Sequence, residues 1–180
     1  MTELEQRATQ MRKDIVAMIA KAGSGHPGGS LSSVEIMMAL YFGGVMNHDP
    51  ANPDDPNRDR FILAKGHAAP VLYTTLAHAG YFAREELMTL RQLGSRLQGH
   101  PDSNLLPGVE VAAGAASGLK LDQSEATVFT LLGDGECEEG QVWEAAMYAA
   151  HYGLDNLVAI VDRNGLQIDG TTDEIMPQLD

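Results

Sequence analysis

The second half of the chain alternates an apolar run, a helical stretch and another apolar run, and this order constrains the fold most strongly. The first run, at 127–136, is rich in β-branched residues and stops at a Gly-Asp-Gly turn. A helical stretch at 140–153 follows, and the second run, at 156–165, also ends in a polar turn. Strand, helix and strand in this order form a right-handed parallel βαβ unit. We therefore expect an α/β fold, an open parallel sheet with helices on both faces.

Several local patterns predict how the helices begin and pack. Residues 3–21 have a helical apolar period with a capping box at Thr2 and Glu5, and their expected buried face is Leu4, Ala8, Met11, Ile15, Met18 and Ile19. The glycine-rich stretch at 22–30 is expected to be non-helical, and Ser32 with Glu35 to cap the next helix. The helix at 140–153 is expected to pack through Val142, Ala145, Ala146, Ala149 and Ala150. Residues 47–59 are acidic and rich in proline, and we expect them to form a surface loop. A calcium-binding loop is disfavoured because its glycine and final glutamate are missing.

The charge balance narrows the class of partner. The 180 residues contain 12 Lys and Arg against 25 Asp and Glu, giving a formal net charge of -13. This argues against a nucleic acid or an anionic membrane as the main partner, and no apolar run approaches the ~20 residues of a membrane span. The N-terminus lacks the apolar core of a secretory signal. A single cysteine, Cys137, excludes an internal disulfide, and the expected location is cytoplasmic.

Polar side chains follow both apolar runs, where ligands collect in open α/β sheets. Asp134 lies in the polar turn that ends the first run and Asn164 in the turn that ends the second, so adjacent parallel strands would place them close together. A carboxylate, an amide oxygen and a nearby main-chain carbonyl are hard ligands that suit Mg²⁺. Gly133 and Gly135 would let the backbone approach a phosphate. Metal and backbone amides could thus hold a diphosphate in a chain with few basic residues.

Five motifs carry a resemblance to a known family. The segment at 133–170 resembles the thiamine-diphosphate signature in its transketolase form, and SGHPGG at 24–29, AKGH at 64–67, QGHPD at 98–102 and LPGVEV at 106–111 occur in the transketolase order. The chain is most similar to the N-terminal subunit of a split transketolase. The resemblance implies a thiamin-diphosphate-binding fold formed by one domain at 1–180. It also implies transfer of a two-carbon ketol unit from a ketose phosphate to an aldose phosphate.

The resemblance also implies roles for particular residues. It implies Mg²⁺ (or Ca²⁺ or Mn²⁺) ligands at Asp134, the Asn164 side chain and the Leu166 main-chain oxygen. It places thiamine diphosphate beside His67, Gly133, Gly135, Glu136 and Asn164, and it makes His26, His67 and His100 catalytic. From the residues alone, simple turn positions are favoured for these histidines over functional roles. Likewise, Glu136, Glu138 and Glu139 fit a solvated helix start stabilised by its dipole.

Two departures from the family pattern bear on activity. The glycine-rich loop that covers the diphosphate is missing between Val111 and Ala112, and the chain stops at Asp180, before the family's domain ends. The glutamate that activates the pyrimidine ring belongs to another domain in this family. We therefore expect a partner chain that carries the pyrimidine-binding domain, in a dimer of heterodimers. A related enzyme such as a deoxyxylulose-phosphate synthase, and a non-catalytic cofactor-binding remnant, remain as alternatives.

Overall fold

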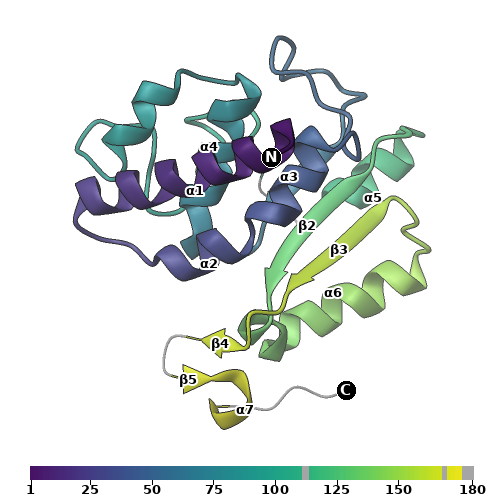
Figure 1. The fold of residues 1–180 in the computed structure, drawn as a ribbon. Helices are drawn as coiled ribbons and strands as arrows, with labels where there is room; N and C mark the ends of the chain where they lie inside the picture. The colour runs from purple at the N-terminus through teal and green to yellow at the C-terminus, as the bar shows by residue number, and fades with distance from the viewer. Residues whose placement is uncertain (111–113, 168–169, 176–180) are drawn as a thin grey trace.

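Three parallel strands order the chain around one sheet. The computed structural model describes residues 1–110, 114–167 and 170–175. The strands are β1 (Arg60–Leu63), β2 (Val128–Gly133) and β3 (Leu157–Asp162), with β2 between the other two. Helix α6 (Gly140–His151) connects β2 to β3, so the predicted βαβ unit is confirmed. Figure 1 shows α1–α4 gathered on one side of the sheet and α6 on the other.

The remaining elements are short apart from α1. The helices are α1 (Glu3–Ala22), α2 (Pro27–Ser32), α3 (Val34–Phe42), α4 (Ala69–Ala79), α5 (Ala115–Leu121) and α7 (Thr172–Ile175). There are also three 3₁₀ helices, η1 (Gly66–Ala68), η2 (Arg84–Thr89) and η3 (Gly135–Glu138). Two short strands, β4 (Leu166–Gln167) and β5 (Gly170–Thr171), form an antiparallel pair. Among the described helices, none has the length and apolar character needed to cross a membrane.

Helix α1 begins and packs largely as its sequence predicts. The Thr2–Glu5 capping box is present. Met11, Ile15 and Met18 are fully buried against the core formed with α3 and α4. The prediction is wrong for Leu4, which is 47% exposed because the first turn of α1 extends beyond that core.

The glycine-rich segment contradicts two local predictions. Helix α2 begins at Pro27 within the stretch expected to be non-helical, and proline suits a first helical position because its φ is already fixed there. The predicted Ser32–Glu35 capping box does not form, because α3 begins after Ser33. Glu35 instead pairs with Arg12 of α1, and the Ser32 hydroxyl lies 2.7 Å from Asp162 Oδ2. Contacts with distant parts of the chain have replaced the local cap.

Helix α6 and strand β3 are more exposed than predicted. No residue of α6 is buried; Val142 and Ala149 are only partly covered, and Ala145, Ala146 and Ala150 are exposed. Large apolar side chains of α6 and β3 reach solvent, namely Trp143, Met147, Tyr148, Val158 and Val161. Because β3 is the last strand of a three-stranded sheet, α6 has little sheet surface to cover. Strand β3 is therefore less buried than its nearly unbroken apolar sequence suggests, although helices lie on both faces of the sheet.

The loop at 47–59 lies mostly at the surface, as predicted, but its last residue is buried. Asp59 Oδ2 accepts from the Asn47 amide at 2.8 Å, and Asp59 Oδ1 accepts from the Thr127 amide at 2.7 Å. One carboxylate thus ties the loop to the start of β2. It holds the starts of β1 and β2 beside each other.

Replacement of Asp59 by alanine should therefore destabilise the fold. Two part-buried backbone amides lose a charged acceptor, and we expect the free energy of unfolding to fall by about 2–3 kcal/mol. Urea denaturation measures the loss. Asp54→Ala, in the exposed part of the same loop, should change stability by less than about 0.5 kcal/mol. Equal losses of stability in the two variants would contradict this role of the Asp59 carboxylate.

Candidate functional site

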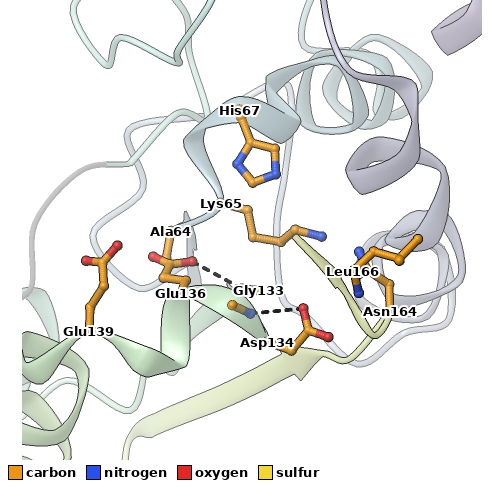
Figure 2. A pocket seen from close by; sticks show the side chains of 10 residues that line it. Ala64, Lys65, His67, Gly133, Asp134, Glu136, Glu139, Asn164 and Leu166 are labelled. Carbon is orange, nitrogen blue, oxygen red and sulfur yellow. Dashed lines mark hydrogen bonds between the residues drawn. The ribbon is translucent and has the colours of Figure 1, made fainter. Parts of the chain in front are cut away.

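A cavity of about 370 Å³ lies at the carboxyl ends of the three strands. Its walls are Ala64, Lys65, His67, Gly133, Asp134, Gly135, Glu136, Glu139, Asn164 and Leu166. These residues follow β1, β2 and β3, so the parallel pairing brings together segments far apart in the chain. In Figure 2, Asp134, Asn164 and Leu166 lie on one side of the pocket and Glu136 and Glu139 on the other. The structure thus gathers the predicted cofactor and metal residues in one place.

Asp134 holds the turns after β2 and β3 together. Its side chain is 2% exposed. Oδ1 accepts from the Gly135 amide at 3.0 Å, and Oδ2 accepts from the Gly165 amide at 2.6 Å. The second bond confirms that Asp134 and the turn containing Asn164 are close in space. The carboxylate is therefore fixed at the pocket wall by backbone donors from both turns.

Asn164 and Leu166 line the same wall. Asn164 Oδ1 accepts from the Leu166 amide at 2.9 Å, which closes a tight turn after β3. Both residues are exposed rather than buried. Among the described residues, no group of three or more His, Cys, Asp and Glu is arranged for a metal ion. A metal here would need a mixed set of carboxylate, amide and main-chain oxygens.

Glu136 and Cys137 line the turn that enters α6. Glu136 accepts from the Gly133 amide at 3.1 Å, and partial burial, with the charge of Glu139 nearby, raises the pKa of Glu136. Cys137 Sγ lies 3.2 Å from the Gly133 carbonyl, and burial raises the pKa of its thiol. A raised thiol pKa suits a structural cysteine rather than a nucleophile.

The three predicted histidines lie together, although only His67 lines the cavity. A side chain on Gly29 would meet His67 Nε2 at 3.0 Å, and one on Gly66 would meet His100 Cδ2 at 2.9 Å. His67 thus lies against a glycine of the SGHPGG motif, which contains His26. His100 lies against a glycine of the AKGH motif, which contains His67. Partial burial, then the positive charges of Lys65, His26 and His100, lower the pKa of His67. All three are also partly open to solvent.

The sequence reasoning missed a buried ion pair behind the pocket. Lys65 Nζ lies 2.5 Å from Asp162 Oδ2, and their side chains are 1% and 8% exposed. The hydrogen bonds from Lys65, Ser32 and Ser33, together with the positive charge, outweigh burial and lower the pKa of Asp162. A lysine directly after the apolar run FILA was the available signal, because such a residue is rarely buried without a partner.

The chain resembles known proteins over almost all of its length. The family profile described as "Transketolase, thiamine diphosphate binding domain" matches residues 4–119 and 116–178. The 6-deoxy-6-sulfo-D-fructose transketolase subunit SqwG of Clostridium sp. is 44% identical over 186 residues, covering 97% of this chain and 67% of that protein. An apulose-4-phosphate transketolase subunit of Phocaeicola vulgatus is 44% identical over 184 residues, covering 96% of this chain and 65% of that protein.

Larger transketolases match the same segment. Human transketolase is 43% identical over 174 residues, which is 91% of this chain and 28% of that protein. The solved structure of transketolase from Leishmania mexicana superposes with a TM-score of 0.90 at 30% identity, covering 99% of this chain and 30% of that one. The chain thus spans about two thirds of the length of the two bacterial subunits and under a third of the full-length enzymes. The sequence, the sheet and the pocket agree that this chain belongs to the transketolase family of transferases and corresponds to its thiamine diphosphate binding domain.

Proposed function

We propose that this chain is the cofactor-binding subunit of a split transketolase, which transfers a two-carbon ketol unit from a ketose phosphate to an aldose phosphate. One observation carries the proposal: Asp134, Asn164, Leu166 and His67 converge on one cavity in a chain of this family. The two bacterial relatives support it, since both are named as transketolase subunits. Their names also suggest a phosphorylated or sulfonated sugar as the donor.

The residues present fit a divalent cation and a diphosphate. Asp134 offers a buried carboxylate, Asn164 an amide oxygen and Leu166 a main-chain carbonyl, and such hard oxygen donors suit Mg²⁺, with Ca²⁺ or Mn²⁺ as substitutes. Gly133 and Gly135 carry no side chain between the turn and a ligand. The cavity volume lies within the range of small-molecule sites. Thiamine diphosphate supplies, when bound, a nucleophilic carbon that can attack a ketose carbonyl.

The chain's own side chains bind the substrate and move protons. With its lowered pKa, His67 is neutral near pH 7, so one ring nitrogen can donate a hydrogen bond while the other accepts one. His26 and His100, beside it, can orient sugar hydroxyls and exchange protons with them. Glu136 and Glu139 close the opposite wall and limit the pocket on that side. These roles are positioning and proton transfer, for which geometry matters most.

A partner chain completes the proposed site. We assign to it the pyrimidine-binding domain and the activating glutamate, in a dimer of heterodimers. We also propose that the present chain is one domain in which the family's diphosphate-covering loop is lost between 111 and 112. That junction lies outside the described residues. The 186 aligned positions of the Clostridium subunit cover only 97% of these 180 residues, so that relative has residues that this chain lacks, as a lost loop requires.

Removal of the Asp134 charge should weaken cofactor binding. Trp143 Nε1 donates to the Cys137 carbonyl at 2.9 Å, so the fluorescence of Trp143 can report occupancy of the adjacent pocket. For Asp134→Asn we expect affinity for Mg²⁺ with thiamine diphosphate to fall by about 100-fold or more, since even outer partners of metals contribute 10–100-fold. Asp122→Asn, on the exposed surface after α5, should bind like the parent. Binding by Asp134→Asn within threefold of the parent would contradict the site.

The titration of His67 should be shifted to acidic pH. Its Cε1–H signal in NMR should titrate below the ordinary pKa of 6.5, and His100→Asn should raise that midpoint by removing a positive neighbour. Because the folded pKa is lowered, the folded chain resists protonation. The associated loss of stability is absent above pH 6.5 and grows as the pH falls from 6.5 through the folded pKa. A midpoint at or above 6.5 would contradict the proposed neutral imidazole.

Ketol transfer should require both chains. We expect this chain alone to release no product from xylulose 5-phosphate with an aldose phosphate acceptor. A C-terminal transketolase subunit should restore turnover. Apulose 4-phosphate, 6-deoxy-6-sulfofructose and pyruvate, tested as donors in the same coupled assay, separate the alternatives. Preference for pyruvate would indicate a deoxyxylulose-phosphate synthase, and binding without turnover in the reconstituted pair would indicate a cofactor-binding remnant.

A further inference from the structure

The Lys65 side chain crosses the carboxyl edge of the sheet, and all N–H donors of its ammonium group are used within the protein. Lys65 follows β1 and Asp162 ends β3, so their ion pair crosses the end of the intervening strand β2. A side chain at Gly133, the last residue of β2, would meet the Lys65 stem at 3.8 Å. Nζ lies 2.5 Å from Asp162 Oδ2, 3.0 Å from the Gly29 carbonyl and 3.1 Å from Ser33 Oγ. These three acceptors use all three ammonium donors.

The same cluster holds α2. Besides Lys65, Asp162 Oδ2 accepts from Ser32 Oγ at 2.7 Å and from Ser33 Oγ at 2.8 Å. Helix α2 has six residues and includes Gly28 and Gly29, and so short a glycine-containing helix is unstable alone. Its conformation therefore depends on contacts outside the helix. The bonds to Lys65 and Asp162 attach it to the ends of β1 and β3.

Two of the candidate histidines depend on where α2 lies. His26 is the residue immediately before α2 and takes an extended conformation at its N-terminus. His67 Nε2 lies so close to Gly29 that a side chain there would meet it at 3.0 Å. The Gly29 carbonyl is itself an acceptor of Lys65 Nζ. A shift of α2 would thus move His26 directly and would remove the surface against which His67 lies.

We propose that Lys65, Asp162, Ser32 and Ser33 form a clamp that positions α2, and through it His26 and His67, for sugar binding. The inference rests on the function proposed above and deepens it. These four are positioning residues, which act through the histidines. Lys65 lines the cavity with its stem, but its charge is used within the protein.

Variants of Ser32 and of the ion pair test the clamp. Ser32→Ala removes one hydrogen bond to Asp162, and Ser32→Thr keeps it. The double variant Lys65→Met/Asp162→Leu removes both charges together, so that neither remains buried alone. Ser30→Ala is the control, because Ser30 lies in the same helix and is itself fully buried, but its hydroxyl is directed to the Ala68 carbonyl and not to Asp162. Amide hydrogen exchange of residues 28–33 and the Cε1–H signals of His26 and His67 are measured on the full chain.

In Ser32→Ala and in the double variant, exchange of the α2 amides should rise about tenfold, the effect of losing one hydrogen bond to a charged group. Both histidine signals should move, while exchange in α1 and α4 stays at the parent rate. Ser32→Thr should restore the parent values. In the reconstituted enzyme, KM for the sugar donor should rise about tenfold in Ser32→Ala.

Failures of the clamp and of the proposed function give different results. Exchange and histidine signals in both clamp variants that match those of Ser30→Ala would overturn the clamp, whatever the activity. Faster exchange with unchanged KM and kcat in an active enzyme would overturn the positioning role. An inactive parent enzyme would overturn the proposed function, and the histidine signals would then still decide whether α2 positions His26 and His67.

Discussion

The parallel pairing of β2 with both neighbours is the constraint on which the pocket depends. In parallel strands all carboxyl ends lie at one edge, and the register that pairs Gly133 with Asp162 aligns the last residues of β2 and β3. Asp134 therefore meets the turn after β3, and Lys65 reaches Asp162 across the end of β2. A slip of one residue in this register would separate both contacts. Asp59 contributes at the opposite end, where it ties the loop before β1 to the start of β2.

The charges that line the pocket favour the binding of an anion only when a cation binds with it. Asp134, Glu136 and Glu139 line the walls, and the charge of Lys65, the one Lys or Arg among the lining residues, is balanced by Asp162. A diphosphate entering alone would meet carboxylates on two sides, and in a partly enclosed cavity such repulsion is poorly screened. A divalent ion held by Asp134 and Asn164 would reverse the local sign. The same reasoning explains how a chain with a net charge of -13 can belong to a family that binds thiamine diphosphate.

The sequence predicted which residues come together at the pocket better than it predicted the contacts around them. The approach of Asp134 to the Asn164 turn followed from the βαβ order alone, and the histidine cluster followed from the family motifs. The start of α2, the failed cap at Ser32 and the buried pair of Lys65 with Asp162 were missed, because these features depend on residues far apart in the chain. The alanines of α6 were wrongly assigned to the core, since helical periodicity gives a direction but not the width of the sheet beneath it.

The exposed apolar side chains of α6 and β3 favour association between molecules of this protein in solution. Trp143 and Met147 of α6 and Val158 and Val161 of the edge strand β3 are exposed, and an exposed edge strand readily pairs with another chain. The net charge of -13 opposes such contacts by mutual repulsion between molecules. That repulsion weakens with added salt and disappears near the isoelectric point of about 4.7. The excess of acidic residues therefore limits self-association of a chain in which, among the described residues, the last strand of the sheet exposes apolar side chains.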